Sequence, residues 1–405
     1  MVIQIMDDKE QCFGIYTNGA FHYNKSTLGL VNQTIYAWSY NEKVNQITES
    51  TETSVEYLHL WTEGQNISEA CPEHLSARYN TVEKKIKAHF NSFRQAKVHL
   101  SDVCFYELVP QKQLEHYYDC RNEICEWILE NREKPNNYRH LHDTYRTIID
   151  ISSRKLNINK HKLYNLRNKD FKARSMWKRF GEDSNITVNY NIFGSVTGRL
   201  TTKPDSFPIM NIKTELRDIV RPTNDVFIEL DFNAAEIRTL ISLSKQQQPE
   251  GDIHEFNQKE IFEGATREEA KTRFFAWLYN RGSKAIQSDF YSRERVLGEY
   301  YREGNIHTPF GRKIECGEFH ALNYLLQSTS SDNCMDRVNK INKFLIGTKS
   351  HVAFTVHDCV VIDMSFEDRN LIPQIKQIFE DTKLGHFMSS VHIGRDLGNM
   401  EKLEW

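Results

Sequence analysis

Two short segments that lie far apart in the chain each place an aspartate beside strand-forming residues. Residues 226–232 contain Asp231, and residues 352–362 contain Asp358. β-Branched and aromatic residues dominate both segments, which is typical of buried strands. A buried carboxylate is costly unless it is paired, and two neighbouring carboxylates repel each other, so a divalent cation is their natural partner. The two segments therefore predict a sheet that carries a two-metal site for phosphoryl transfer.

The composition limits the class of protein. A chain of 405 residues can form two or three domains with packed cores. No apolar stretch is long enough to span a membrane, and the N-terminus lacks the pattern of a signal peptide. The eight cysteines form no Cys-x-x-Cys pair, which argues against a structural zinc site and for a reducing compartment. We therefore expect a cytoplasmic protein with no membrane partner.

Positive charge is concentrated in one part of a chain whose net charge is −3. Ten lysines and arginines, Lys172 and Arg174 among them, lie between Arg154 and Arg179, and Asp170 is the one acid there. Taken alone, such a run is most often a solvated face. Because it comes shortly before a Thr-Gly-Arg-Leu segment at 197–200, we interpret it as a strip that follows a phosphate backbone.

A helix predicted to begin at Arg267 has an unusual face. Thr266 and Glu269 have the spacing of a capping box, which satisfies free amides at a helix start. Two cations and then two aromatic residues follow at steps of four: Arg267, Lys271, Phe275 and Tyr279. This face suits a ligand with a phosphate tail and a flat base. In the alternative interpretation, the aromatic side chains belong to the core and the cations are solvated.

In their order along the chain, these features resemble the motifs of family A DNA polymerases, the group that contains bacterial DNA polymerase I. The resemblance spans roughly residues 190 to 405 and includes segments on both sides of the predicted helix. The segments are 197–200 with 210–212, 231–238 (motif A), 252–254, 267–279 (motif B), 308–312 with 323–327, 356–358 (motif C) and 393–398. Any one of these motifs is a weak signal, whereas seven in order are a strong one.

The resemblance implies a catalytic centre. Asp231 and Asp358 would ligate two Mg²⁺ ions, with Mn²⁺ as a substitute, and the backbone carbonyl of Phe232 would be a further ligand. Lys271 would grip the nucleotide phosphates and protonate the leaving pyrophosphate.

The resemblance also implies a nucleotide pocket. Arg267 would bind the phosphates together with Lys271. Phe275 would stack near the sugar and base, Tyr279 would close the pocket and pair with Glu236, and His254 would belong to the same pocket. Glu236 would lie beneath C2′ of the sugar and leave no room for a 2′-hydroxyl, so the substrates would be deoxynucleotides.

For the second substrate, primer-template DNA, the resemblance implies contacts on both sides of the catalytic centre. Arg199 would reach the primer strand, and His357 would support the primer terminus. Asn323 and Gln327 would bind minor-groove acceptors that all base pairs share. Lys172 and Arg174 lie in the basic strip and would contact the backbone.

We therefore expect an α/β (α+β) chain whose C-terminal part is a right-hand polymerase palm with an antiparallel sheet and helical fingers. The predicted parts are 1–112, a mixed α/β exonuclease-like domain; 113–185, a helical connector with a reduced thumb; and 186–405, the palm, with the fingers inserted at about 245–300. In the first part we predict a hairpin at 15–23, a strand at 34–40 and a helix at 81–93.

Three departures from the family pattern leave alternatives open. Cys359 follows Asp358 where the family has a glutamate, and little chain is left for a thumb. In the N-terminal part, Arg121 stands four residues after Tyr117, where an exonuclease motif has an aspartate, so we expect that domain to be inactive. The trimmed architecture favours a compact phage-type enzyme in a bacterial host cytoplasm, with a processivity factor or another replisome protein as a partner. The alternatives are a single-subunit RNA polymerase and a non-catalytic subunit that binds primer-template.

Overall fold

The computed structural model describes residues 2–6, 12–17, 20–22, 58–97, 109–204, 206–280, 282–283, 285–286, 288 and 290–403. The chain divides into two compact units, Met1–His142 and Asp143–Trp405. Each unit has a hydrophobic core of its own. The predicted division into three parts, with boundaries near 112 and 185, stays a prediction.

The first unit begins with an antiparallel sheet of three strands. These strands are β1 (Val2–Met6), β2 (Cys12–Thr17) and β3 (Ala20–His22), in the order β1-β2-β3. Thr17 pairs with Ala20, which confirms the predicted hairpin. Its two turn residues and the strand predicted at 34–40 lie outside the described residues.

Helices form the rest of the described part of the first unit. They are α3 (Leu58–Trp61), α4 (Ile67–Ala70), α5 (Glu73–Gln95) and α7 (Gln111–Asn131). Helix α5 confirms the helix predicted at 81–93. It packs against α7 around buried side chains that include Tyr79, Leu114 and Ile124. On α7 the Arg121 guanidinium lies 5.4 Å from the centre of the Tyr117 ring. A relationship of this unit to exonucleases stays a prediction.

The second unit is built around a sheet of five strands. They are β8 (Val226–Phe232), β12 (His351–Val356), β13 (Cys359–Met364), β16 (Ser389–Gly394) and β17 (Met400–Lys402). The order is β12-β13-β8-β16-β17, and every neighbouring pair is antiparallel. The central strand β8 therefore pairs with segments more than a hundred residues away in sequence, which only the tertiary fold can bring together.

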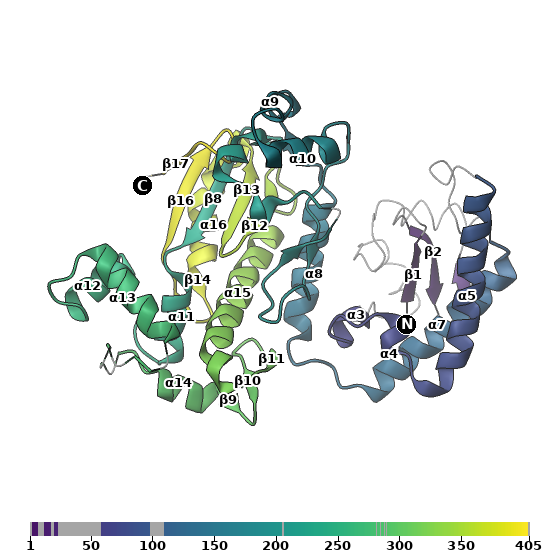
Figure 1. Ribbon diagram of the computed structural model, residues 1–405, viewed down its shortest axis with the longest axis horizontal. Helices are drawn as coiled ribbons and strands as arrows, with labels where there is room; N and C mark the ends of the chain where they lie inside the picture. Colours follow the sequence, from purple (N-terminus) through teal and green to yellow (C-terminus); the bar gives the residue numbers. More distant parts are fainter. Residues whose placement is uncertain are drawn as a thin grey trace. The chain divides into compact units, whose positions relative to one another are not determined.

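Two helices pack against this sheet. The 27-residue helix α15 (Glu318–Phe344) lies alongside β12, and α16 (Ile372–Glu380) contacts β8 and β16 (Figure 1). The Phe232 ring at the end of β8 stacks on Phe379 of α16 with their centroids 4.0 Å apart. This aromatic contact fixes the end of the strand that carries Asp231.

A second group of helices projects from the sheet on one side (Figure 1). They are α11 (Ala235–Leu243), α12 (Ile253–Glu260), α13 (Arg267–Tyr279) and α14 (Arg293–Tyr300). Their apolar faces share one core with the first turns of α15, including Leu240, Phe274 and Leu325, each 0 % exposed. Helix α13 begins at the predicted Thr266–Glu269 capping box, so that prediction is confirmed.

The remaining helices and strands of the described residues are mostly short. The helical ones are α8 (Tyr138–Ser152), α9 (Lys160–Leu166), α10 (Phe171–Phe180) and the 3-10 helices η1 (Ile209–Asn211), η2 (Thr214–Ile219) and η3 (Phe366–Leu371). The strands are β4 (Asn157–Ile158), β5 (Tyr190–Asn191), β6 (Thr201–Thr202), β7 (Val220–Arg221), β9 (Tyr301–Arg302), β10 (Asn305–His307), β11 (Lys313–Glu315), β14 (Asp381–Thr382) and β15 (Gly385–His386). The chain is thus mixed α/β with antiparallel sheets, as predicted. Among the described helices, none combines the length and apolar character that crossing a membrane requires.

Candidate active site

The two aspartates that the sequence singles out meet at one end of the five-stranded sheet. Asp231 of β8 lies directly opposite Cys359, the first residue of β13. Asp358 precedes Cys359 in the two-residue turn between β12 and β13, where Val356 pairs with Cys359. His357, the other turn residue, is exposed and has a positive φ of 54°. Asp358 therefore occupies a hairpin turn beside Asp231, and the strand-forming residues on its two sides belong to two different strands.

The surroundings of both carboxyl groups disfavour the ionised form. Asp231 is open to solvent at the end of β8, but the protein atoms around it partly desolvate its carboxyl group and raise its pKa to about 7, and the negative charges of Glu229 and Asp358 add to the shift. Burial also raises the pKa of Asp358, although Arg199 acts in the opposite direction. One Asp358 oxygen, Oδ1, is buried and has no hydrogen-bond partner. The positive charge that Arg199 brings near Asp358 does not offset burial and the neighbouring negative charges, so a bound divalent cation would stabilise the ionised forms of both carboxyl groups.

The raised pKa of Asp231 predicts a pH-dependent stability in the metal-free protein. Folding favours the protonated carboxyl group, so its contribution to stability is complete below about pH 4, the ordinary aspartate range. The contribution is lost as the pH rises through the folded-state pKa of about 7. We expect the melting temperature of the free protein to fall across this window, and Asp231→Asn to remove much of the fall.

Thermal melts over this pH range, with and without Mg²⁺, measure the effect. Added Mg²⁺ should raise the melting temperature of the wild type most at the highest pH of this range. There Asp231 is ionised, and protons no longer compete with Mg²⁺ for its carboxylate. Asp225→Asn, at the opposite end of β8, is the matched control and should keep the wild-type slope. An unchanged slope in Asp231→Asn would contradict the assignment of the shift to this carboxyl group.

Arg199 enters the site from the loop between β5 and β6. The turn before it depends on Gly198, whose φ is +75°, a backbone conformation that other residues rarely adopt. An added Cβ on Gly198 would lie 2.4 Å from Cζ of Arg312. Arg312 is fixed in turn by two hydrogen bonds to the buried Asp332, of 3.0 and 2.7 Å. The loop that carries Arg199 is therefore held against a guanidinium group that cannot easily move.

Glu236 lies in the first turn of α11, directly after β8. The strand passes into the helix through Ala234, whose φ of 53° is unusual for alanine. The fully buried Arg238 holds this connection, because it donates hydrogen bonds to the carbonyl oxygens of Asn233 at 2.9 Å and Gly251 at 2.8 Å. Glu236 is thereby placed close to the strand end that carries Asp231.

The predicted face of α13 is partly exposed, although Phe275 also packs against the edge of the core. Arg267, Lys271 and Phe275 are partly exposed and Tyr279 is 44 % exposed, whereas Phe274 and Trp277 are buried on the opposite side. The alternative in which both aromatic side chains are core residues therefore does not hold for Tyr279. The Phe275 and Tyr279 rings are nearly parallel, with centroids 6.0 Å apart.

Arg267 and His254 lie at the other end of this face. Arg267 forms a 2.7 Å ion pair with Asp252, the N-cap residue of α12. Burial opposes ionisation of Asp252, but hydrogen bonds from Arg267 and two backbone amides together lower its pKa to about 2. The His254 ring is buried, 6.2 Å from the Phe275 ring, and its Nδ1 atom has no hydrogen-bond partner. Burial lowers the pKa of His254, so this imidazole is neutral near pH 7.

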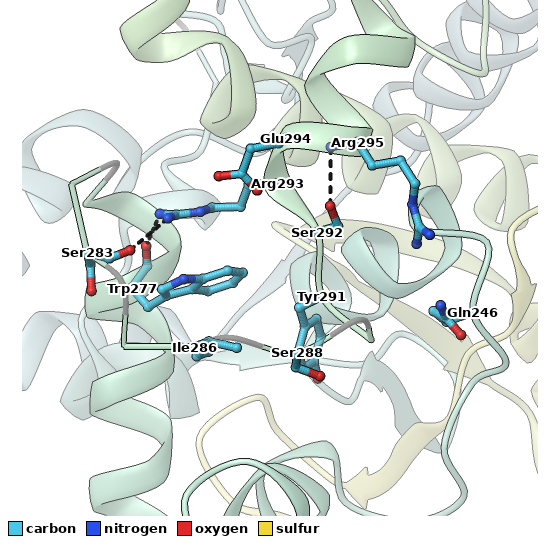
Figure 2. A pocket seen from close by; sticks show the side chains of 10 residues that line it. All are labelled: Gln246, Trp277, Ser283, Ile286, Ser288, Tyr291, Ser292, Arg293, Glu294 and Arg295. Carbon is cyan, nitrogen blue, oxygen red and sulfur yellow. Dashed lines mark hydrogen bonds between the residues drawn. The ribbon is translucent and has the colours of Figure 1, made fainter.

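The C-terminal end of α13 is held by Arg293. Its guanidinium donates hydrogen bonds to the carbonyl oxygens of Trp277 at 2.7 Å and Ser283 at 2.8 Å (Figure 2). A third hydrogen bond, of 2.9 Å, reaches the carbonyl oxygen of Asn280. A pocket of about 440 Å³ opens beside these residues, and Gln246 and Tyr291 also line it (Figure 2). Because Trp277 faces away from the Arg267–Tyr279 side of α13, this pocket is separate from the candidate active site.

Asn323 and Gln327 lie on the half-exposed side of α15, one turn apart. Tyr279 and Asn323 both line a second pocket of about 480 Å³, together with Phe319, which is 74 % exposed. The structure thus brings Asn323 near Tyr279, and Gln327 lies one turn further along the same side of α15.

Lys172 and Arg174 lie elsewhere, on the exposed side of α10. In Figure 1, α10 is at the end of the sheet opposite to α11, so these two residues are not part of the carboxylate site. Much of the basic strip has structural partners: Lys162 forms an ion pair with Asp218, and Arg167 lies 3.2 Å from the centre of the Tyr164 ring. Only part of the strip is therefore left for a phosphate backbone.

Glu229 is a site residue that the sequence interpretation missed. It precedes Asp231 by two residues, which places both side chains on the same face of β8. On its other side His392 of β16 approaches, with 3.6 Å between Nδ1 and Oε1 of Glu229. The alternation in Glu229-Leu230-Asp231 was the signal that could have found it. Arg238 and Asp332 were also missed, because a buried charged residue whose partners lie elsewhere in the fold has no local sequence signature.

The donor set fits magnesium. Carboxylate oxygens are the ligands that Mg²⁺ prefers, and it commonly uses one or two carboxylates together with substrate phosphates. Such oxygens come from the carboxylates of Asp231 and Asp358, and the Oδ1 atom of Asp358 has no hydrogen-bond partner. In the described ranges, no three His, Cys, Asp or Glu residues form a ready-made metal cluster. This arrangement suits ions that bind together with a phosphate substrate. The Phe232 ring packs against Phe379 and Phe387, and its backbone belongs to the pairing of β8 with β16, so its role as a carbonyl ligand stays a prediction.

Comparison with solved structures identifies the fold. The chain resembles the polymerase domain of Pol1 from M. smegmatis, solved in complex with DNA primer-template and dNTP, at a TM-score of 0.56 and 13 % sequence identity. The match covers 71 % of this chain and 76 % of the Pol1 chain. The fold is that of a DNA polymerase domain. No family model matches the sequence, and no curated protein matches it either. The predicted assignment of a palm and of inserted fingers to these elements stays a prediction.

Proposed function

We propose that this chain is a template-directed DNA polymerase that adds deoxynucleotides to a primer 3′-hydroxyl and releases pyrophosphate. The observation that carries the proposal is the meeting of three segments at one sheet end. The Asp231 strand, the Asp358 turn and the loop with Arg199 converge there beside Glu236 and Tyr279. The solved neighbour with this fold was bound to primer-template and dNTP, which supports the same substrates here.

The residues divide the chemistry among them. Bound at Asp231, Asp358 and the Phe232 carbonyl, Mg²⁺ or Mn²⁺ would lower the pKa of the primer hydroxyl and neutralise charge on the phosphates. Lys271 and Arg267 supply positive charge along one face of α13 for the phosphate tail. Lys271 donates a proton to the departing pyrophosphate. His254, beside Phe275, offers its unpartnered Nδ1 to the same ligand.

Residues on both sides of Asp231 and Asp358 select the substrate. Phe275 and Tyr279 present nearly parallel rings to the base and sugar. Glu236 excludes the 2′-hydroxyl of a ribonucleotide. Asn323 and Gln327 face the minor groove of the newly formed pair. Arg199 and His357 contact the primer end, and Lys172 and Arg174 contact the backbone further away.

The biological setting is part of the proposal. The second unit, with a basic helical pair α9–α10 in place of a long thumb, fits a compact phage-type enzyme of family A that acts in a host cytoplasm. Such an enzyme would hold duplex DNA weakly and would depend on a processivity factor or another replisome protein.

Primer extension on a defined template tests the proposal. The wild-type protein with Mg²⁺ should extend the primer only with the deoxynucleotide that complements each template base. Duplex binding without extension would favour the non-catalytic subunit, for which Cys359 is the main argument. Efficient extension by ribonucleotides in place of deoxynucleotides would favour the RNA polymerase instead.

A further inference from the structure

Glu236 is held on both of its carboxylate oxygens by residues from two separate elements. Arg199, from the loop between β5 and β6, donates a 2.8 Å hydrogen bond to Oε1. The hydroxyl of Tyr279, the last residue of α13, donates to Oε2. Because a glutamate side chain is free to rotate about three bonds, two partners on fixed elements are needed to hold it in one orientation.

We infer that Arg199 is a positioning residue for Glu236 and therefore helps to determine which sugar the enzyme accepts. The inference rests on the proposed function and deepens it. Glu236 can exclude a 2′-hydroxyl only if its carboxylate stays where that hydroxyl would lie. A carboxylate that rotates away makes room for the ribose, so the loss of either partner weakens the exclusion.

The ion pair between Arg199 and Glu236 is partly shielded from solvent, and Arg199 comes from a loop whose position is fixed. The Arg199 side chain is 32 % exposed and that of Glu236 is 15 % exposed, so solvent screens the pair less than an ordinary surface ion pair. The loop behind Arg199 is fixed by the close approach of Gly198 to Arg312, which is bound to Asp332. Tyr279 by contrast is 44 % exposed at a helix end, so Arg199 supplies the more rigid of the two partners.

Arg199 also lies near a second carboxylate, since Nη2 is 3.9 Å from Oδ2 of Asp358. A role at Asp358, or the predicted role at the primer strand, would affect the incorporation of every nucleotide. A role at Glu236 alters the ratio between deoxynucleotides and ribonucleotides. The two kinds of role therefore differ in what a substitution does to this ratio.

The test compares kcat/KM for a dNTP and the matching rNTP in wild type, Arg199→Gln and Arg199→Lys. Arg199→Gln should lower the preference for the deoxynucleotide by about tenfold, the scale of discrimination that one well-placed contact provides. Arg199→Lys keeps a cationic donor and should retain more of the preference. Arg302→Gln, an exposed arginine of β9, is the matched control and should leave the ratio unchanged.

The same substitution in a Glu236→Ala background isolates the mechanism. With its partner removed, Arg199→Gln should no longer change the sugar ratio, although it can still lower both rates. Equal losses for both sugars in the Glu236-containing enzyme would overturn the inference and leave the proposed polymerase intact. So would a further change of the ratio in the Glu236→Ala background. A wild type that incorporates neither nucleotide would contradict the proposed function and this inference together.

Discussion

Asp358→Asn should abolish primer extension while leaving the protein folded and able to bind duplex DNA. Asparagine keeps the shape of the side chain but removes a negative charge from the turn between β12 and β13. Loss of a charged ligand costs several kcal/mol of transition-state stabilisation, and each 1.4 kcal/mol is about tenfold in rate. We therefore expect the rate to fall by about a thousandfold or more.

The stability of Asp358→Asn separates loss of the site from misfolding. Burial raises the pKa of Asp358, which shows that the folded protein disfavours its charged form. The neutral variant should therefore melt at a higher temperature than the wild type at any pH at which Asp358 of the wild type is ionised. Asp225→Asn, whose Oδ2 accepts a hydrogen bond from Phe366 far from the site, should keep wild-type activity. Normal extension by Asp358→Asn would remove this carboxylate from the catalytic centre.

Gly198→Ala should cause the second-largest loss. At a φ of +75°, alanine strains the backbone by roughly 1–2 kcal/mol. Its Cβ would also lie within 2.8 Å of three Arg312 guanidinium atoms, which the bonds to Asp332 hold in place. The loop must then shift, and Arg199 shifts with it. A displacement of about 1 Å in a catalytic constellation costs about a hundredfold in rate, which is the loss we expect.

Gly304→Ala is a matched control for this prediction. Gly304 has almost the same φ, +77°, but a Cβ added there would meet nothing within 4 Å. Both variants should lose a similar amount of stability through backbone strain, whereas only Gly198→Ala should lose most of its activity. Steady-state extension rates and thermal melts of the two variants measure this difference. Equal activity in the two variants would show that the approach to Arg312 does not position Arg199.

Local sequence patterns predicted the elements of this fold well. The strand at 226–232, the capping box at Thr266 and the helix after it depend on neighbouring residues, and the structure contains all three. The four-residue spacing on α13 also predicted which side chains share a face. Asp358 was harder to place, because strand-forming residues lie on both sides of it and no turn-forming glycine or proline marks the two-residue turn between them. Only the pairing of Val356 with Cys359 reveals the hairpin.

Contacts between distant segments could not be predicted in this way. Arg199 was expected at the primer strand, and its bond to Glu236 joins residues 37 positions apart. Arg312 and Asp332 form a buried pair across a loop and a helix, and the sequence marks neither as the partner of the other. The approach of His392 to Glu229 likewise joins β16 to β8, which are distant in the sequence. Long-range pairing depends on the packed fold, which periodicity does not encode.

The most direct test of the central claim is the location of Mn²⁺ by anomalous scattering in crystals grown with primer-template and a complementary dNTP. The account predicts bound Mn²⁺ between the Asp231 and Asp358 carboxylates, with the phosphate tail of the nucleotide beside Lys271 and Arg267. A primer terminus and nucleotide seated elsewhere, with no Mn²⁺ at these two aspartates, would contradict it.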